Sequence, residues 1–312
     1  MIDLRKLRVL RELSRAGTIG GAAQALHLTP QAVSQQITTL GKELGVQLTE
    51  PVGRRLRLTS AARIVLRHAD VMFEQVEQMR ADLAAHHGGE RGQVAVAGFS
   101  TTLSALILPA VALLKKERPM LRMVLTEADP PESFAMLHRG ETDVVISADT
   151  VRSPGEEGPR FHREPLCEDP FDVALPEGHR HADRSPLRLA DLADETWIFA
   201  TTGMCHDIGV AACTAAGFVP QDSHAIGDWD ATLAAVQLGL GVALIPRLAS
   251  PAARPGVTVR AFTEAPPSRS VFAAVREGSQ ASPEIVAVLD ALREVATGAV
   301  RRRRVSAVVS AA

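Results

Sequence analysis

Cys205, His206 and Asp207 are the residues of this chain whose types suit nucleophilic catalysis, because they supply a thiol, a base and a carboxylate. They stand side by side at the start of a predicted helix. A nucleophile, its base and the group that orients the base normally converge in space from separate parts of a chain. We therefore expect no catalytic site here and predict that the chain is not an enzyme.

The cysteines could also carry redox chemistry. Cys205 and Cys213 are eight residues apart, so in a continuous helix they are separated by about 12 Å, too far for a disulfide without unwinding. Thiol-based redox sensing is thus a minority hypothesis. The pairs His86-His87 and His179/His181 lack further nearby ligands, so we expect no metal ion and no cofactor.

A third kind of chemistry is base recognition by uncharged polar side chains. Amide and hydroxyl groups recur at helical spacing in the segment that follows Pro30, at Gln31, Ser34, Gln35 and Thr38. Short side chains of this kind can read base edges in the major groove. A solvated helix surface would look similar, so the neighbouring elements must decide.

Those elements form a helix-turn-helix pattern. Apolar residues three apart over 4–13 predict a first helix, and Gly17 ends it. Thr18 can cap a second helix over 19–26. Thr29 and Pro30 suit the cap and first turn of a third helix that runs to about residue 44.

A basic hairpin follows the third helix. The alternation over 55–58, after a turn that contains Gly53, predicts one strand of a short wing. Arg54 and Arg55 at its tip could reach phosphates or the minor groove. Residues 1–67 carry 11 Lys and Arg against 4 acidic residues, whereas residues 68–312 carry 23 against 32. A basic head on an acidic body indicates that the head meets a polyanion.

The chain closely resembles the LysR-type transcriptional regulators through residues 26–40 (LHLTPQAVSQQITTL), 44–46 (LGV) and 54–59 (RRLRLT). The resemblance implies that Thr29, Gln31, Ser34 and Gln35 meet DNA and that the wing arginines contact its backbone. The predicted DNA-binding set is Thr18, Thr29, Pro30, Gln31, Ser34, Gln35, Thr38, Arg54 and Arg55. Peroxide-sensing members of the family use two cysteines in the region of Cys205 and Cys213, but the surrounding sequence here differs from theirs.

A long helix should follow the wing, because residues 59–85 contain neither Gly nor Pro. Its apolar residues follow a four-three repeat, which is typical of packing against another helix. The predicted dimerisation residues are Ala62, Leu66, Ala69, Phe73, Val76 and Leu83. The alternative is a helix that lies on its own domain. Gly88 and Gly89 predict a hinge near residue 90.

Strands and helices alternate beyond residue 90, which predicts an α/β body with a mostly parallel sheet. The predicted strands cover 93–98, 122–126, 143–148, 171–175, 197–200, 242–245, 257–262 and 270–275, and the predicted helices cover 102–116, 132–139, 207–216, 230–238 and 283–296. The resemblance implies a bilobal, periplasmic-binding-protein-like (type 2) effector domain, crossed by two strands, whose final helix returns to the first half. We expect a winged helix-turn-helix over 1–59, a linker helix and hinge over 60–89, an effector domain over 90–300 and a basic tail over 301–312. Within the effector domain, residues 90–163 with 267–300 form one subdomain and 164–266 the other.

The carboxyl ends of two strands carry hydroxyl groups, which is where open α/β sheets bind ligands. Hydroxyls and free N–H groups at helix starts suit an anion, although plain helix capping is the alternative. No arginine is assigned to this cleft, so a carboxylate effector is an extrapolation. The predicted effector-binding residues are Ser100, Thr101, Thr102, Ala148, Thr201, Thr202, Gly203, Cys205, Trp229 and Thr232.

These observations favour a sequence-specific transcriptional regulator whose partners are double-stranded DNA, a small-molecule effector and a second copy, as a homodimer or homotetramer. RNA polymerase is a further candidate partner. The rival is a small-molecule binding protein or enzyme with an incidental basic head. Hydrophobic content of 46% and charged content of 22% exclude disordered and collagen-like classes. With no apolar run long enough for a membrane span, we expect a cytoplasmic protein without a membrane partner.

Overall fold

The computed structural model describes residues 2–52, 55–86, 92–149, 161–249, 254–263 and 266–309. The backbone separates into two compact units, residues 1–82 with 277–279, and residues 83–276 with 280–312. Arg54, the hinge glycines and the loop 153–159 lie outside the described residues, as do the side chains of Arg55 and of 301–304.

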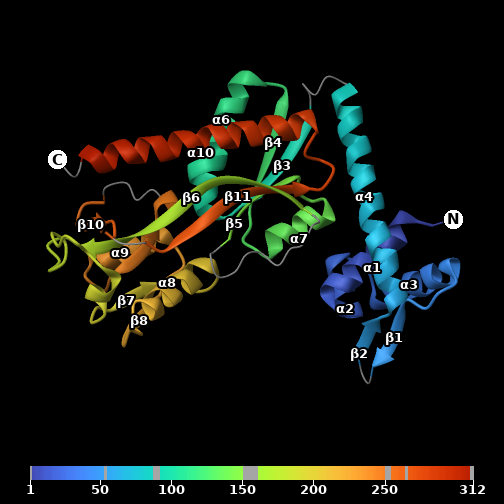
Figure 1. Cartoon of the computed structure of the whole chain (residues 1–312), viewed down its shortest axis with the longest axis horizontal. Helices are drawn as coiled ribbons and strands as arrows, with labels where there is room; N and C mark the ends of the chain where they lie inside the picture. Colours follow the sequence, from blue (N-terminus) through green and yellow to red (C-terminus); the bar gives the residue numbers. More distant parts are fainter. Residues whose placement is uncertain are drawn as a thin grey trace. The chain divides into compact units, whose positions relative to one another are not determined.

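The first unit contains the predicted three helices, the wing and most of the long helix (Figure 1). Its elements are α1 (Leu4–Ala16), α2 (Ile19–Ala25), α3 (Pro30–Leu44), β1 (Thr49–Val52), β2 (Arg55–Leu58) and α4 (Ser60–His86). The two strands pair antiparallel, with Thr49 opposite Leu58. A helix-turn-helix with a β-wing is therefore the fold of this unit.

Local capping explains where these helices begin and end. Thr18 Oγ1 accepts the Gly21 N–H at 3.1 Å, and Thr29 Oγ1 accepts the Ala32 N–H at the same distance. Gly17 ends α1 with a φ of 66°, a left-handed conformation that costs glycine little. The capping predictions for Thr18, Thr29 and Gly17 are confirmed.

The core of the first unit is built from the apolar stripes of its helices. Residues from α1, α2, α3 and α4 all enter one buried cluster. Ala22 and Ala23 are 0% and 2% exposed, which lets the other helices approach α2 closely. Buried Val33, Ile37 and Leu40 fix one side of α3, so its opposite side is left for solvent or a partner.

A seven-stranded sheet organises the second unit, in the order β10-β6-β11-β5-β3-β4, with β9 paired to β6. The strands are β3 (Gly92–Gly98), β4 (Leu121–Glu127), β5 (Val144–Asp149), β6 (Phe161–Pro176), β9 (Ala243–Pro246), β10 (Val257–Arg260) and β11 (Ser268–Arg276). Two further strands, β7 (Trp197–Phe199) and β8 (Ser223–Ala225), pair parallel with each other.

The expectation of a mostly parallel sheet is wrong. β3 runs parallel to β4 and β5, but β11 is antiparallel to both β5 and β6, and β6 is antiparallel to β9 and β10. The alternation of elements reveals strands but not their partners. The central pair β6–β11 joins segments about a hundred residues apart, and this long-range pairing sets the direction. The prediction also missed β8 and the first ten residues of β6.

Helices cover the sheet in both halves of the second unit (Figure 1). They are α5 (Ser100–Thr102), η1 (Leu103–Ile107), α6 (Leu108–Glu117), α7 (Glu132–Arg139), η2 (Leu189–Leu192), α8 (Met204–Ala215), α9 (Trp229–Gln237), η3 (Arg247–Ala249) and α10 (Pro283–Val309). The predicted helix over 102–116 contains a π-helical turn, η1, just before Pro109. Proline lacks the N–H that a regular α-helical turn needs, which accounts for the irregular geometry.

The two halves have separate cores, and β6 and β11 contribute to more than one of them. Val271 and Val275 of β11 belong to the first core, which also receives Ile285 and Leu292 of α10. Phe171 and neighbouring residues of β6 belong to the second core. The return of the final helix to the first half is thus confirmed. Among the described residues, no helix is long and apolar enough to cross a membrane.

Candidate nucleic-acid interface and effector site

The exposed side of α3 carries the polar residues that the sequence singled out. Gln31, Ser34, Gln35 and Thr38 are all exposed, whereas Val33 on the opposite side is 0% exposed. Within the described residues, the side chains of Gln31, Ser34 and Gln35 make no hydrogen bond to the rest of the chain. Their donors and acceptors are therefore available to an external partner.

Three threonines of the predicted DNA-binding set have hydroxyls that already serve the backbone. Thr18 and Thr29 cap α2 and α3, and Thr38 Oγ1 donates to the Ser34 carbonyl at 2.9 Å. Pro30 occupies the first turn of α3, where its missing N–H costs nothing. These residues shape and orient α3 even where they also lie on its exposed side.

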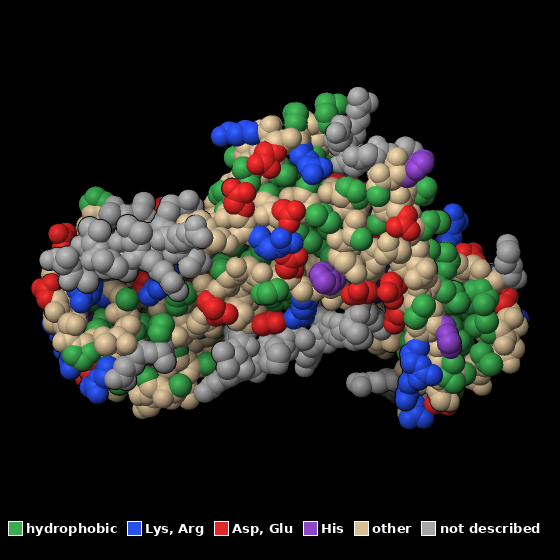
Figure 2. All heavy atoms as spheres, turned by 45° about the horizontal axis from the view of Figure 1, so that its top comes forward, with side chains coloured by type: hydrophobic (Ala, Val, Ile, Leu, Met, Phe, Trp, Pro, Cys, Tyr) green, Lys and Arg blue, Asp and Glu red, His purple; other side chains and the backbone are tan. Residues whose placement is uncertain are grey.

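The wing carries one arginine whose charge is balanced within the hairpin. Arg57 of β2 donates through Nε to Glu50 Oε1 of β1 at 2.9 Å, and the two residues lie directly opposite in the strand register. Both side chains are largely exposed, so this ion pair contributes little stability. Figure 2 shows basic side chains gathered on the first unit, at the right of the view.

The predicted dimerisation seam on α4 needs a correction. Ala62, Leu66 and Ala69 are buried inside their own unit, in the core that α1 and α3 also form. Phe73 is half-buried and lies 4.0 Å beneath the guanidinium of Arg11 of α1. A four-three repeat identifies an apolar face, but not the partner that covers it. Here the helices of the same chain cover its first half.

The remaining seam residues and several others on α4 are accessible. Val76 is half-buried and Leu83 is 52% exposed. A second apolar stripe combines Leu83 with four residues that the sequence prediction did not identify. Its members, Ile64, Val71, Met72, Met79 and Leu83, are 39–55% exposed. We call these five residues the α4 stripe.

The predicted effector residues in the first half divide into exposed and buried members. Ser100 is exposed at the start of α5, whereas Thr101 and Thr102 are 3% and 0% exposed. Thr102 Oγ1 donates to the Phe99 carbonyl at 2.8 Å, a local bond back to the preceding turn. Ala148 is buried in the first core. Ser100 is thus the predicted residue of this half with an accessible side chain.

In the second half, Thr201, Thr202 and Gly203 are exposed before α8, with Gly203 at a φ of 80°. Thr232 is buried, and its hydroxyl donates to the Asp228 carbonyl at 2.8 Å. Trp229 is half-buried and packs on the apolar cluster under α9. Those two residues support the shape of the half rather than offering free hydrogen-bonding groups.

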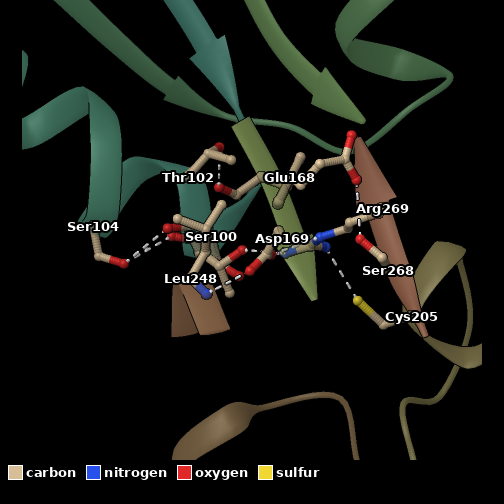
Figure 3. A network of polar contacts seen from close by, with 11 residues as sticks. Ser100, Thr102, Ser104, Glu168, Asp169, Cys205, Leu248, Ser268 and Arg269 are labelled. Carbon is tan, nitrogen blue, oxygen red and sulfur yellow. Dashed lines mark hydrogen bonds and ion pairs between the residues drawn. The ribbon is translucent and has the colours of Figure 1, made fainter. Parts of the chain in front are cut away.

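Sequence reasoning missed the residue that joins the predicted sites of both halves. The Arg269 guanidinium donates to Thr101 Oγ1 at 2.9 Å through Nη2. It also donates to Cys205 Sγ at 3.3 Å through Nη1 (Figure 3). Arg269 is 3% exposed and lies 4.6 Å from the centre of the Phe99 ring. No arginine was assigned to this site from the sequence, and the structure places Arg269 in contact with predicted residues of both halves.

Asp169 balances the charge of Arg269. Its Oδ2 accepts from Arg269 Nε at 3.0 Å and from Nη2 at 2.8 Å, and its Oδ1 accepts the Leu248 N–H at 2.8 Å. Asp169 is 0% exposed and lies directly opposite Arg269 in the pairing of β6 with β11. The sequence does offer one signal for this ion pair, namely a charged residue at an inward-facing position of a strand. Such a residue is buried only when it has a partner of opposite charge.

The two cysteines of α8 lie in different environments. Cys205 is half-buried beside Arg269, and burial raises the pKa of its thiol more than Arg269 lowers it. Cys213 is buried in the second core, and burial raises the pKa of this thiol to about 12. Both lie in one continuous helix, so the separation of about 12 Å expected from their spacing applies.

Two of the histidines singled out by the sequence, His179 and His206, contact acidic neighbours, whereas His87 lies outside the described residues. His179 Nε2 lies 3.3 Å from Glu195 Oε2, and Arg180 donates to the same carboxylate at 2.9 Å. His206 Nδ1 lies 3.1 Å from Asp207 Oδ1. Within the described ranges, no cluster of His, Cys, Asp and Glu is arranged to hold a metal ion.

Comparison with known proteins gives concordant results for both units. The family described as bacterial regulatory helix-turn-helix protein, lysR family, matches residues 4–63, and the LysR substrate binding domain matches residues 87–297. The DNA-binding transcriptional dual regulator OxyR of Escherichia coli K12 is 29% identical over 297 residues, which cover 94% of this chain and 95% of that protein.

Solved structures show the same fold. A substituted OxyR of Corynebacterium glutamicum with hydrogen peroxide bound has a TM-score of 0.60 at 23% identity, and the match covers 96% of this chain and 94% of that one. Full-length CbnR, a LysR family regulator in complex with its target DNA, has a TM-score of 0.56 at 21% identity, with coverage of 95% and 100%.

Proposed function

This chain belongs to the LysR family of transcriptional regulators, and we propose that it recognises its operator through the exposed side of α3. It is a DNA-binding transcriptional regulator with an effector-binding domain. The observation that supports α3 as the reading element is its division into two sides: an apolar side buried in the core, and a polar side on which Gln31, Ser34 and Gln35 have no internal side-chain partner. Gln31, Ser34 and Gln35 would contact base edges.

In this proposal the other members of the DNA-binding set position the helix on the duplex. Thr18 and Thr29 hold the starts of α2 and α3, where backbone N–H groups approach phosphates. Arg54 and Arg55 of the wing would contact the sugar-phosphate backbone or the minor groove. Phosphate contacts of this kind set affinity and salt dependence, whereas the α3 side chains set sequence preference.

The test compares specific with non-specific binding. Ser34→Ala and Gln35→Ala should each weaken binding to the operator by about 1–3 kcal/mol, and binding to random DNA much less, because they remove base contacts. Operator DNA is taken from the intergenic region beside the gene by footprinting, and affinity is measured by fluorescence anisotropy. Gln36→Ala is the matched control, because the neighbouring Gln36 is half-buried on another side of α3. Equal losses on both DNAs would contradict base reading.

A second copy of the chain is proposed to cover the α4 stripe. LysR-family regulators oligomerise, and the buried residues of the predicted seam are already used within the unit. The stripe offers accessible apolar area along α4, which is what a helix partner would bury. Two copies would present two α3 helices to a near-palindromic operator. Whether dimers pair further into tetramers stays a prediction.

Val71→Asp or Met79→Asp tests this surface, because a buried charge would oppose association. Sedimentation velocity should show a lower oligomeric state across the micromolar range. Arg80→Asp is a larger change of charge, but Arg80 lies nine residues after Val71, half a turn away on α4, and Leu83 is the stripe residue one turn from it. It should therefore disturb the oligomer less than Val71→Asp does. Dissociation by Arg80→Asp alone, with intact oligomers of the stripe variants, would place the interface elsewhere.

A small-molecule effector is proposed to bind beside the carboxyl ends of β3 and β7, at the exposed groups of Ser100, Thr201, Thr202 and Gly203. The remaining predicted residues, Thr101, Thr102, Ala148, Cys205, Trp229 and Thr232, would form the walls behind them. Because Asp169 balances Arg269, the accessible groups are neutral hydroxyls and backbone N–H groups. Contact with RNA polymerase also stays a prediction.

Thiol redox sensing is the second candidate function, and one contact favours it: the Cys205 thiol lies beside a buried guanidinium. The similarity to OxyR, including a structure with hydrogen peroxide bound, points the same way. In the reaction, the Cys205 thiolate attacks one peroxide oxygen, the O–O bond breaks, the sulfur becomes a sulfenic acid, and the hydroxide released is protonated to water.

Peroxide treatment followed by mass spectrometry tests this candidate. Hydrogen peroxide should modify the Cys205 peptide and change operator affinity in the wild type, but not in Cys205→Ser. Cys213→Ser should retain the first oxidation step, because the buried Cys213 is not the attacking thiol. An operator affinity that is insensitive to peroxide would leave the small-molecule effector as the regulatory signal.

A further inference from the structure

The guanidinium of Arg269 lies between two groups that compete for its charge, the carboxylate of Asp169 and the thiol of Cys205. Two of its nitrogens donate to Asp169 Oδ2, at 3.0 and 2.8 Å, and a third donates to Cys205 Sγ at 3.3 Å. The carboxylate and the sulfur approach the guanidinium from different sides (Figure 3). Arg269 thus contacts both groups at once.

Asp169 dominates this competition. The side chains of Arg269 and Asp169 are 3% and 0% exposed, so water screens their attraction very little. A free carboxyl group ionises at a pH of about 3.9 and a free thiol at about 8.5, so at neutral pH the carboxylate is the anion that pairs with the guanidinium. The sulfur consequently faces an ion pair with no net charge.

The fold holds Asp169 in this position from three directions. Asp169 and Arg269 are Cα partners in adjacent strands, and the second carboxylate oxygen of Asp169 accepts the Leu248 N–H of η3. Phe99 and Phe171 lie against the guanidinium, with ring centres at 4.6 and 5.6 Å. Rotation of the carboxylate away from Arg269 would break several contacts together.

The charged groups around Cys205 come from three elements: Arg269 from β11, Asp169 from β6, and Asp129 from the loop after β4. Burial raises the pKa of the thiol, Arg269 opposes this change, and the two carboxylates add to it. A thiol becomes a strong nucleophile when a nearby cation stabilises its thiolate. Arg269 would do so if Asp169 did not balance its charge.

We propose that Asp169 is an internal counterion that keeps Cys205 mostly in its less reactive thiol form at neutral pH by neutralising Arg269. Asp169 is a positioning residue in this scheme, since it acts on the sulfur through the guanidinium. The inference builds on the proposed redox function of the same site. It adds that the reactivity of Cys205 is set by how closely Asp169 is held against Arg269.

The test is the pH profile of Cys205 alkylation in the full-length chain. Iodoacetamide is added at a series of pH values, and the rate for the Cys205 peptide is followed by mass spectrometry, separately from Cys167 and Cys213. Asp169→Asn keeps the size of the side chain but removes its charge. The profile should move to lower pH. A tenfold increase in the acidity of the thiol raises the thiolate fraction at neutral pH about tenfold, but a more acidic thiol gives a weaker nucleophile. The alkylation rate at neutral pH should therefore rise only about three- to fourfold for each tenfold increase in acidity.

Two variants separate electrostatics from loss of structure. Glu168→Gln removes the same charge from the adjacent residue, which is exposed and accepts from Ser268 Oγ at 3.0 Å, so its profile should match the wild type. The double variant Asp169→Asn with Arg269→Gln removes both charges of the pair. Its Cys205 should react no faster than in the wild type, whereas a rate raised merely by unfolding would stay high.

Two results would overturn the proposal: an unchanged profile in Asp169→Asn, or a wild-type Cys205 pKa below about 8.5, the ordinary value of a thiol. The second measurement needs no variant, so the proposal can be refuted even if Asp169→Asn does not fold. Failure of the redox function is distinguishable. In that case the alkylation profile moves as expected while operator affinity stays insensitive to hydrogen peroxide.

Discussion

The polar groups on the exposed side of α3 and those around Arg269 differ in whether they have hydrogen-bond partners within the chain. On α3, Gln31, Ser34 and Gln35 have no internal partner and face outward. Around Arg269, every polar side chain that touches the guanidinium is bonded within the chain, and the ion pair is buried. Groups left unpaired on a surface cost little until a partner arrives, whereas groups buried in the interior must be paired in advance.

This difference separates binding from stability. Substitutions on the α3 surface should change affinity for DNA and leave folding alone, since they remove no internal contact. Substitutions in the Arg269 site should change folding first, since each removes a partner from a buried group. Three experiments test the contrast, in order of decreasing expected effect.

The largest effect is expected for Arg269→Met, which leaves the Asp169 carboxylate buried without its cation. The free energy of unfolding of the effector domain should fall by about 3–5 kcal/mol, measured by urea denaturation. Combining it with Asp169→Asn should recover part of the loss, because the double variant buries no unpaired charge. Ser34→Ala should stay within about 0.5 kcal/mol of the wild type. A similar loss in Ser34→Ala would remove the contrast between the two regions.

A smaller effect is expected at Cys213, a buried group whose pKa is about 12 because of burial. The thiol of the unfolded chain ionises near a pH of about 8.5. Its contribution to stability is therefore complete below that pH and is lost as the pH rises toward 12. The slope is at most about 1.4 kcal/mol per pH unit.

Urea denaturation at several alkaline pH values measures this slope. The Cys213→Ala variant lacks the ionising group, so the stability difference between it and the wild type should shrink in size as the pH rises. A difference that is constant between pH values of about 8 and 11 would show that ionisation of Cys213 is not linked to folding.

The smallest effect is expected for Thr29→Ala. Thr29 caps the start of α3, and its hydroxyl, unlike the polar groups of Gln31, Ser34 and Gln35, is hydrogen-bonded within the chain. Loss of the hydrogen bond to the Ala32 N–H should lower the free energy of unfolding by about 1 kcal/mol. Thr29→Ser retains the hydroxyl and should remain close to the wild type. If Thr29→Ala left stability unchanged, the cap at the start of α3 would not contribute to folding.

Much of the first unit could be predicted because its signals are local. Thr29, Pro30 and Gly45 lie within or beside the helix that they delimit, and α3 has the predicted bounds. In the second unit, the bounds of α7 were also predicted correctly. The α4 seam was predicted less well, because Ala62 and Leu66 show an apolar face whose partner is a separate helix.

Only some residues of the candidate site in the second unit could be predicted from the sequence. Thr101 and Cys205 were singled out as neighbours of strand ends, but the residue that joins them, Arg269, was placed just outside a predicted strand. Asp169 lay in the part of β6 that was not predicted as strand at all. The sequence around neither Asp169 nor Arg269 contains a local pattern that indicates an ion pair between them.

The sequence by itself determined the helix-turn-helix, the capping of its helices, the polar side of α3 and the alternation of strands and helices in the body. These features depend on interactions between residues a few positions apart, which spacing and residue type encode directly. Only the tertiary structure decided that α4 covers its own unit, that β6 and β11 run antiparallel, and that Asp169 meets Arg269 between Thr101 and Cys205. Those outcomes depend on which distant segments pair, and a contact across a hundred residues leaves no periodic trace in the chain.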